Sequence, residues 1–412
     1  MNKRAVVTGV GVIAPNGIGT EDFWKGLVSG KSAIRKITRF DASSYPCQIA
    51  GEVGQFDPVD FMSPKIARKS TRYAQFAVAA ARLALRDSGL HPERSDNHRM
   101  GIYMGNSLGG LELLEEQFMV FHEKGIRRLN PFTAMVAYPQ SAASQLAIEF
   151  NVRGPTLTLS TGCPAAVNAV DVAIQEIQRG TIDVALVGGT EAPITPFSFA
   201  EFCASRTLAN HYHQPEAACR PFDRNRSGWV MSEGAAVLVL EELGHAASRS
   251  VNIYGEVLGC SSMNDAHSLH GIDPLGNGLY RSMKDALSKA RLSPQEIEYV
   301  SAHAPSMSVT DKVETEIIKK VFGEYAYRIP ISSIKSMIGQ PLAATAAFQL
   351  VACLLGFRDQ TIPPTINHEY PDPECDLDCV PNKARKRTVD TALINTHGFG
   401  GLNATLIVRG TH

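Results

Sequence analysis

Cys163 has the sequence context of a nucleophile. It follows the run Thr156 to Ser160, where polar and apolar residues alternate as in a strand, and it precedes apolar residues at helical spacing. Pro164 suits the first position of a helix, where no N–H is needed. A thiol at a helix start lies near the positive end of the helix dipole, which lowers its pKa and favours the thiolate. The sequence therefore predicts a reactive, ionised Cys163 rather than a structural cysteine.

Three other segments carry groups that could act together with this thiol. His303 ends one predicted strand, and Lys335 and Gln340 follow the end of another, in Lys-Ser-Met-Ile-Gly-Gln-Pro. The turn Gly-Phe-Gly-Gly at residues 398–401 can offer backbone N–H groups. A thiolate that attacks a thioester needs donors for the developing oxyanion, and the N–H groups of Cys163 and Phe399 could supply them. A histidine and an amide side chain could then stabilise a second negative charge.

Two short motifs suggest other functions. Gly105-Asn-Ser107-Leu-Gly109 matches the nucleophile elbow of serine hydrolases and follows a predicted strand, so a serine hydrolase is an alternative. We interpret Ser107 as a loop residue beside a pocket, because no motif marks a partner histidine. Gly9-Val-Gly11-Val-Ile-Ala resembles a dinucleotide fingerprint, but Pro15 interrupts it where the phosphate-binding helix should begin.

Composition excludes several classes of function. Charged residues are 20% of the 412 and the net charge is −1, so no nucleic-acid partner is expected. We see neither a signal sequence nor an apolar run of membrane-spanning length. Eight irregularly spaced cysteines favour a reducing compartment, and Cys375 and Cys379 lack a second ligand pair for a metal. The sequence predicts a cytoplasmic globular protein with no metal site.

The order of predicted elements indicates a duplicated α/β fold. Strands and helices alternate along the chain, and the segment 251–412 repeats the order found in 1–250. We expect strands at 5–13, 101–105, 156–160, 182–191, 229–241, 251–259 and 297–303, and a last one in the stretch 391–401 that ends in the glycine turn. Helices are expected at 20–28, 71–88, 165–177, 277–290 and 341–355. Small residues dominate the helices after Cys163 and Pro341, which suits helices held between two sheets. The expectation is a five-layered αβαβα fold built from two halves, 1–250 and 251–412.

With these residues in place, the chain resembles the β-ketoacyl-acyl-carrier-protein synthases, in particular the elongating type II enzymes and polyketide ketosynthases. The resemblance covers essentially the whole chain. It includes Arg-Pro-Phe-Asp-Arg-Asn-Arg-Ser-Gly-Trp from residue 220, Glu-Gly-Ala-Ala from residue 233 and Pro-Pro-Thr-Ile-Asn from residue 363. That family has the fold of the thiolases, which agrees with the duplicated α/β reading.

The resemblance implies a reaction and its partners. Cys163 would accept an acyl group from a carrier-protein thioester, and a malonyl thioester would then lose CO₂ and condense with the acyl-cysteine. Substrates would arrive on the phosphopantetheine arm of an acyl carrier protein, with no other cofactor. The chain would form a homodimer, or a heterodimer with a ketosynthase-like subunit, in a pathway of the fatty-acid or polyketide type.

The resemblance also implies roles for single residues. His303 matches the histidine of the family motif His-Gly-Thr-x-Thr, Lys335 the lysine of Lys-Ser-x-x-Gly-His, and Phe399 the gating phenylalanine. Four further residues match positions that line the acyl pocket near the dimer interface: Leu108, Thr133, Ala134 and Phe202.

The largest departure from the family pattern is Gln340, which replaces the second active-site histidine. An amide can donate a hydrogen bond but can neither carry a charge nor relay a proton. A neutral donor also stabilises an enolate less than a charged one. We therefore expect slower or altered decarboxylation, with acyl transfer to Cys163 less affected.

Other departures affect the expected substrate contacts. The histidine motif becomes His-Ala-Pro-Ser-Met at 303–307, so two threonine hydroxyls that contact the pantetheine arm in the family are missing. Ser306 or Ser308 is expected to hold that arm instead. His397 stands where the family has a phenylalanine before the glycine turn, and we expect it to contact substrate.

Several functions remain open on these residues. The chain could be a condensing enzyme with a Cys-His-Gln site, an acyltransferase that loads Cys163 without chain extension, or a malonyl decarboxylase. It could also be a non-catalytic subunit that shapes a partner's pocket, although such a subunit has no need of the thiol at Cys163. The condensing enzyme is the leading hypothesis.

Overall fold

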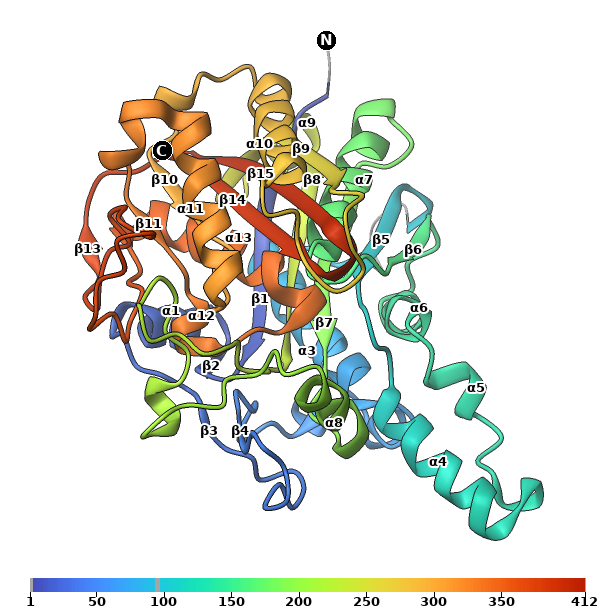
Figure 1. The fold of residues 1–412 in the computed structure, drawn as a ribbon. Helices are drawn as coiled ribbons and strands as arrows, with labels where there is room; N and C mark the ends of the chain where they lie inside the picture. The colour runs from blue at the N-terminus through green and yellow to red at the C-terminus, as the bar shows by residue number, and fades with distance from the viewer. Residues whose placement is uncertain (1–2, 93–96, 412) are drawn as a thin grey trace.

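The structure is a computed structural model that describes residues 3–92 and 97–411 (Figure 1). The strands of the first half form one side of a mixed sheet in the order β6-β5-β7-β8-β1. β5 runs parallel to β6 and β7, whereas β8 is antiparallel to β7 and β1. The bounds are β1 (Ala5–Ala14), β5 (Met100–Gly105), β6 (Thr156–Leu159), β7 (Val184–Glu191) and β8 (Gly234–Glu242).

The second half repeats this order as β11-β10-β14-β15-β9. Its strands are β9 (Gly255–Asn264), β10 (Tyr299–Ser301), β11 (Ile331–Ser332), β14 (Thr391–Gly398) and β15 (Leu402–Gly410). β1 pairs with β9 only at Val6↔Glu256 and Val7↔Gly255, so the two halves of the sheet join along one short seam. The expected duplication is confirmed, whereas the division of the chain at residue 250 stays a prediction.

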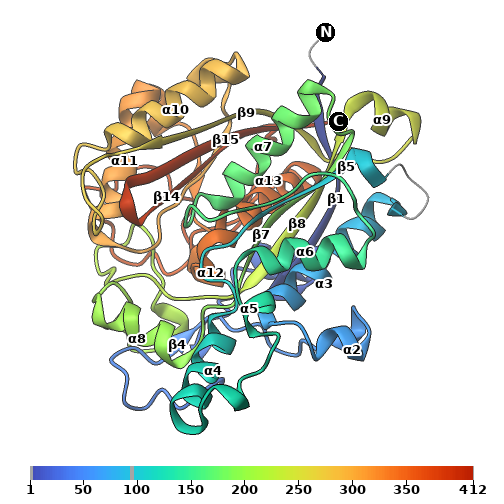
Figure 2. The same ribbon diagram turned by 90° about the vertical axis from the view of Figure 1, so that its right-hand side faces the viewer.

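Helices form three layers around the two halves of the sheet, which confirms the five-layered αβαβα architecture. α7 (Ala165–Arg179) and α13 (Thr345–Asp359) lie between the halves and pack against strands of both. α3 (Arg72–Ser88) and α6 (Gln140–Glu149) cover the outer face of the first half. α10 (Asn277–Ala290), with α11 (Ser308–Phe322) beside it, covers that of the second (Figure 2).

The remaining regular elements are short connections or surface segments. They are β2 (Gly17–Ile18), α1 (Thr20–Val28), β3 (Arg35–Lys36), β4 (Ile49–Ala50), α2 (Pro64–Ala67), α8 (Pro196–Ala204), α9 (Leu243–Ser248), α12 (Lys335–Ile338), β12 (Thr361–Ile362) and β13 (Arg385–Lys386).

The glycines of β1 serve helix packing rather than nucleotide binding. Gly9 and Gly11 lie inside the continuous strand, and no glycine loop follows them. A Cβ at Gly11 would lie 2.0 Å from the carbonyl oxygen of Ala80, and one at Gly9 would lie 2.3 Å from that of Ala84. Both carbonyls belong to α3, so these glycines let the helix backbone approach the strand closely.

α13 belongs to a long apolar segment of the chain. Residues 342–359 are long and apolar enough to cross a membrane by composition, so the expectation that no apolar run has membrane-spanning length is wrong. However, 89% of this window is buried inside the protein, where α13 packs between the two halves of the sheet. Its apolar character is therefore that of a core helix.

Several predicted boundaries shift near the ends of elements. The helix expected at 341–355 is split into a 3₁₀ turn at Leu342–Ala344 and α13 from Thr345. The strand expected at 297–303 ends at Ser301, so His303 lies just beyond it. β8 begins only at Gly234, whose φ of 139° is a conformation that residues with side chains rarely adopt.

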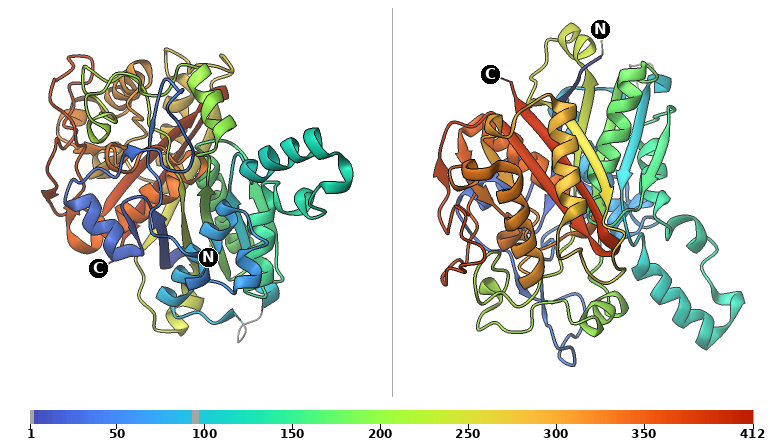
Figure 3. Two further views of the ribbon diagram at one scale, coloured as in Figure 1. Left: turned by 90° about the horizontal axis from the view of Figure 1, so that it is seen from below. Right: turned by 45° about the horizontal axis from the view of Figure 1, so that its top comes forward.

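An arm projects from the body of the molecule (Figure 3). It consists of α4 (Leu111–Lys124), a 3₁₀ turn at Ile126–Arg128 and α5 (Thr133–Val136). Large apolar side chains on the arm are exposed, among them Phe118, Met119, Phe121, Ile126 and Met135. Such a concentration of apolar surface is typical of an interface with another chain.

Candidate active site

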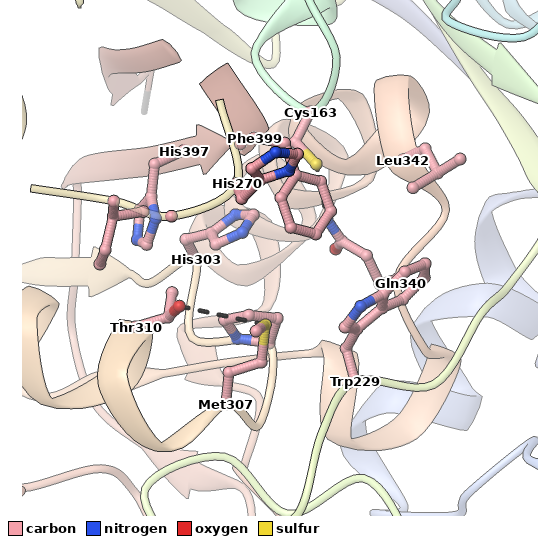
Figure 4. A pocket seen from close by; sticks show the side chains of 14 residues that line it. Cys163, Trp229, His270, His303, Met307, Thr310, Gln340, Leu342, His397 and Phe399 are labelled. Atoms are coloured by element: carbon pink, nitrogen blue, oxygen red, sulfur yellow. Dashed lines mark hydrogen bonds between the residues drawn. The ribbon is translucent and has the colours of Figure 1, made fainter. Parts of the chain in front are cut away.

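Cys163 lies in the turn that joins β6 to α7. Gly162 takes a positive φ of 65°, and its carbonyl accepts a hydrogen bond from the N–H of Ala165 at 3.0 Å, which begins the helix. The side chain of Cys163 is largely buried and lines a cavity of about 70 Å³ (Figure 4). The other lining residues are Trp229, His270, Gly271, Ile272, His303, Pro305, Met307, Thr310, Gln340, Leu342, His397, Gly398 and Phe399.

Gln340 contacts the thiol directly. Its side-chain Nε2 donates a hydrogen bond to Cys163 Sγ at 2.9 Å. The Thr345 hydroxyl, at the start of α13, donates to Gln340 Oε1 at 3.0 Å. Because the oxygen end of the amide is taken by a donor, the NH₂ end must face the sulfur. The replacement of a histidine by glutamine therefore leaves a hydrogen-bond donor at the nucleophile.

The expectation that Cys163 is an ionised thiolate is wrong for this structure. Burial raises the pKa of the Cys163 thiol to about 11, although the charge of Lys335 and the hydrogen bond from Gln340 act in the opposite direction. Removal of a charge from water costs more than these two interactions return. At neutral pH the thiol is therefore protonated, and its proton must be transferred when the sulfur reacts.

His303 follows β10 and is held through its backbone. The Glu314 carboxylate, on α11, accepts hydrogen bonds from the N–H groups of His303 at 2.9 Å and Ala304 at 2.7 Å. The imidazole is almost fully buried, and its Nδ1 has no hydrogen-bond partner among the described residues. Burial, with the nearby charges of His397 and Lys335, lowers the pKa of His303 well below its ordinary value, so the ring is neutral.

Lys335 is the first residue of α12, and its side chain is buried. Within the described part of the chain, its Nζ has no hydrogen-bond partner. Burial lowers the pKa of Lys335 to about 8, while the charge of Glu314 acts to raise it. The ammonium remains mostly protonated at neutral pH, and its positive charge interacts with both Glu314 and the thiol.

The glycine turn lies against the nucleophile. A Cβ at Gly398 would lie 3.4 Å from the backbone N of Cys163, so glycine keeps the space before this N–H open. Phe399 is 43% exposed at the edge of the cavity, and its ring stacks on Phe202 with centroids 6.5 Å apart. This geometry is compatible with the expected oxyanion hole, in which the N–H groups of Cys163 and Phe399 would take part.

Leu108 and Phe202 belong to an apolar cluster next to the cavity. Phe202 packs edge-to-face on Trp229 at 5.0 Å, and both Trp229 and Leu342 line the cavity. The backbone N–H of Leu108 donates to the buried carboxylate of Glu191 at 3.2 Å. These two predicted residues therefore lie behind the lining rather than in it.

Four other predicted substrate residues lie away from the cavity. Thr133 and Ala134 are on α5, in the projecting arm. The Ser306 hydroxyl is completely buried and accepts the backbone N–H of Arg220 at 3.0 Å, so it is not free for a substrate. Ser308 is exposed at the start of α11 and does not line the cavity.

Sequence reasoning missed several residues of the cavity. The Thr310 hydroxyl lines it and lies 4.0 Å from Met307 Sδ, its one polar contact among the described residues. His270 reaches it from the loop between β9 and α10, where no sequence motif marks it. The three-residue step from Met307 to Thr310, which is close to one helical turn, is a signal that could have identified the threonine.

The structure gives no support to the competing site types. The Ser107 hydroxyl is buried without a hydrogen-bond partner in the described residues, so no histidine activates it. Across residues 3–92 and 97–411, no group of three or more His, Cys, Asp and Glu side chains could hold a metal. All eight cysteines are free.

Comparison with known proteins agrees with this geometry. The model of the beta-ketoacyl synthase N-terminal domain matches residues 2–246, and that of the C-terminal domain matches residues 254–369. The 3-oxoacyl-[acyl-carrier-protein] synthase 2 of Coxiella burnetii is 40% identical over 406 residues, which is 98% of each chain.

Solved structures show the same fold. The ishigamide ketosynthase/chain length factor superposes with a TM-score of 0.94 at 33% identity, over all of both chains. A type II PKS ketosynthase bound to the hexaketide, in complex with its acyl-carrier protein, superposes with a TM-score of 0.91 at 33% identity, also over all of both chains. The chain therefore belongs to the beta-ketoacyl synthase family.

Proposed function

We propose that this chain is a ketosynthase that takes an acyl group onto Cys163 and extends it by decarboxylative condensation with a malonyl thioester. The observation that carries the proposal is the hydrogen bond from Gln340 Nε2 to Cys163 Sγ, in a cavity that His303 also lines. The proposed nucleophile and a neutral amide donor thus share a small space with His303, one of three histidines that line it.

In the first step the thiol of Cys163 adds to the carbonyl of an acyl thioester. A sulfur–carbon bond forms, and the oxyanion accepts hydrogen bonds from the N–H groups of Cys163 and Phe399. The intermediate collapses with cleavage of the bond to the carrier's sulfur. Because the resting thiol is protonated, its proton passes to the neutral imidazole of His303 and from there to the departing thiolate.

In the second step a malonyl thioester loses CO₂ and becomes an enolate, with negative charge on the thioester oxygen. The NH₂ group of Gln340 and an N–H of His303 donate to that oxygen. The enolate carbon attacks the acyl-cysteine carbonyl, the carbon–sulfur bond breaks, and the sulfur of Cys163 leaves as a thiolate that takes a proton from solvent to restore the resting thiol. An amide stabilises an enolate less than a charged donor does, so this step should be the slower one.

We infer that an acyl carrier protein delivers both substrates on its phosphopantetheine arm and that no other cofactor takes part. The support is a solved relative that is a complex of a ketosynthase with its acyl-carrier protein. Phe399, partly exposed at the cavity, marks the side from which the arm would enter. The cytoplasm is the compartment we expect, since eight irregularly spaced cysteines favour a reducing environment.

The cavity of one chain is too small for a long acyl group, because about 70 Å³ holds only a few water molecules. We propose that the acyl chain continues toward a second chain, either a copy of this one or a ketosynthase-like partner. Two observations support an interface near the first half. The edge strand β6 has Leu157 47% exposed, and the arm carries exposed apolar residues. Thr133 and Ala134 would then reach the acyl pocket of the adjacent chain.

Intact-protein mass spectrometry tests the proposal. The protein is incubated with an acyl-loaded carrier protein, and one acyl mass should appear on the peptide that contains Cys163. Malonyl-carrier protein is then added, and a β-ketoacyl-carrier product should follow. The Cys163→Ala variant serves as the control and should form neither species.

The outcomes separate the alternative functions. Acylation without chain extension would identify an acyltransferase, and loss of CO₂ from malonyl-carrier protein without a condensed product would identify a decarboxylase. A Cys163 that stays unmodified with acyl groups of several lengths, alone and with a ketosynthase-like partner, would identify a pocket-forming subunit. That last function has one supporting observation, because a solved relative is a ketosynthase/chain length factor.

A further inference from the structure

The wall of the cavity contains an indole N–H that the proposed reaction does not use. The side chain of Trp229 is 2% exposed and lines the cavity, and its Nε1 has no hydrogen-bond partner among the described residues. The other tryptophan of the chain, Trp24, donates its N–H to Asp359 at 2.6 Å. Buried indole N–H groups usually find such a partner, because an unpaired donor removed from water costs free energy. Trp229 therefore keeps an unused donor beside the cavity.

Backbone hydrogen bonds hold this indole in place. The N–H of Trp229 donates to the carbonyl of Thr207 at 3.1 Å, and its carbonyl accepts the N–H of Ala209 at 2.9 Å. The N–H of the preceding Gly228 donates to the carbonyl of Ser306 at 3.1 Å, which ties this segment to the loop that joins β10 to α11. The indole is therefore fixed relative to that loop, which also lines the cavity.

A threonine hydroxyl lines the same cavity. Thr310 is 7% exposed in the first turn of α11, and among the described lining residues it is the one that carries a hydroxyl. The hydroxyl contacts Met307 Sδ at 4.0 Å, and a thioether is only a weak acceptor. The oxygen of Thr310 can therefore still accept a hydrogen bond. In Figure 4 Met307 lies between Thr310 and Trp229, so the acceptor and the donor flank one part of the cavity.

One unused donor and one unused acceptor are the complement of a secondary amide, which offers a C=O and an N–H. The side-chain amide of Gln340 is already engaged at both ends, by Cys163 and by Thr345. No Lys or Arg is among the described residues that line the cavity, and a carboxylate buried without a countercharge is costly. A neutral amide therefore suits this wall better than a charged group does.

We propose that Trp229 and Thr310 form a binding subsite for one secondary amide of the pantetheine arm: the indole N–H donates to the amide carbonyl, and the threonine hydroxyl accepts the amide N–H. This assignment rests on the proposed function, in which substrates arrive as thioesters of that arm. In Figure 4 Cys163 lies on one side of the cavity, and Trp229 and Thr310 lie on the other. A short ethylene link joins the sulfur of the arm to its first amide, so a thioester at Cys163 carries that amide toward this pair. The subsite thus supplies polar contacts that the loop after β10 lacks.

Calorimetric titration with pantetheine tests the subsite without any chemistry. A second probe is the ester analogue in which oxygen replaces the N–H of the amide nearest the thiol, so that the carbonyl stays and the donor is lost. The wild-type protein should bind pantetheine roughly 2- to 13-fold more tightly than the analogue, as expected for one neutral hydrogen bond. Thr310→Val should weaken the binding of pantetheine by a similar factor and remove the difference between the two probes. Thr310→Ser keeps the hydroxyl and should keep the difference.

The donor is tested by Trp229→Phe, which keeps an aromatic ring and removes the N–H. This variant should bind both probes more weakly by about the same factor, because both carry the carbonyl. The preference for pantetheine over the ester should remain, since Thr310 is intact. Trp24→Phe is the matched control, because the N–H that it removes is paired with Asp359 and does not line the cavity, and it should leave both affinities unchanged.

Equal binding of the two probes by the wild-type protein, or no binding of pantetheine, would overturn the proposal, and neither measurement needs a variant that folds. The proposal also fails if the preference for pantetheine survives in Thr310→Val. It fails as well if Trp229→Phe leaves both affinities unchanged and alters only the KM for malonyl-carrier protein, which would assign the N–H to the malonyl carboxylate. The titration needs no acyl transfer. A protein that shows these affinities but does not extend an acyl group therefore has the subsite without the proposed condensation.

Discussion

In each half of the chain a strand leads to a central helix near the cavity, but the two strand–helix connections differ in length and in the residues they contain. In the first half β6 ends at Leu159 and α7 begins at Ala165, so a tight turn presents Cys163. In the second half β11 ends at Ser332 and α13 begins only at Thr345. This longer connection contains α12 and Gln340, whose amide donates to the sulfur. The β6–α7 and β11–α13 connections are thus equivalent in the duplicated fold. The additional residues of the β11–α13 connection include Gln340, which acts on Cys163 in the β6–α7 connection.

Each half also contains a buried carboxylate, Glu191 in the first and Glu314 in the second, and the two differ in pKa and in the groups around them. Glu191, in the first half, accepts backbone N–H groups that hold the loop after β5, and burial raises its pKa to about 7. Glu314, in the second, lies near His397 and Lys335 and has a pKa below its ordinary value. One carboxylate is near neutrality and organises backbone, whereas the other is an anion among titratable side chains. The first half therefore supplies the nucleophile and the second half handles protons and charge.

The largest expected effect comes from the first half. Cys163→Ser puts a hydroxyl in place of the thiol that accepts the hydrogen bond from Gln340. A hydroxyl ionises far less readily than a thiol. Acylation by a carrier-protein thioester should fall on the order of 10⁴-fold, since loss of a nucleophile costs at least this much in comparable enzymes. The measurement is the rate of acyl incorporation by intact mass. Acylation of Cys163→Ser at a rate close to that of the wild-type protein would place the acyl group elsewhere.

The second prediction tests the state of the thiol. With a pKa of about 11, Cys163 should react with iodoacetamide at a rate that rises about tenfold per pH unit between pH 7 and 10. The sign follows from the raised pKa, because the thiolate fraction grows with pH until the pKa is reached. Peptide mapping separates this cysteine from the other seven. A rate that is already constant from pH 7 upward would show a thiolate in the resting enzyme and would restore the helix-dipole expectation.

Local sequence signals predicted the fold well. The helices at 20–28 and 277–290 were predicted with the bounds that the structure shows, because periodic apolar residues mark both and acidic residues mark the first turn of the earlier one. The five layers followed from repeated element order and from small residues in two helices. The 3₁₀ turn at Leu342–Ala344 was not predictable, since its conformation depends on packing against β7 and β8 of the other half.

The sequence predicted which residues meet at the site better than it predicted their protonation states. Cys163, His303, Gln340 and the glycine turn do meet at one cavity, although Thr310 and His270 were missed. The pKa of Cys163 was predicted in the wrong direction because the sequence shows a helix start but not how deeply the sulfur is buried. Burial of a charge is a property of the assembled structure, and it decided the outcome here.

The third prediction concerns the contribution of the second half to chemistry. Gln340→Ala removes the donor to Cys163 Sγ and to the proposed enolate, and decarboxylation of malonyl-carrier protein should fall about 100-fold. Gln340→His should instead raise decarboxylation above wild type, because a protonated imidazole is a stronger donor. Release of CO₂ is the measurement. Equal rates in all three proteins would exclude the amide from this step and would leave His303 as the sole donor.

The smallest expected effect comes from the residue that orients the amide. Thr345→Val removes the hydroxyl that donates to Gln340 Oε1 at 3.0 Å and keeps the branched shape at this buried helix start. The amide of Gln340 is then free to rotate and to turn its oxygen toward the sulfur, where it cannot donate. Loss of one neutral hydrogen bond of about 0.5–1.5 kcal/mol should lower the decarboxylation rate roughly 2- to 13-fold. Thr345→Ser keeps the hydroxyl and should retain most of the activity. If Val and Ser give the same rate, the amide is held by its contact with Cys163 alone, and the second half depends on the first for the geometry of its own donor.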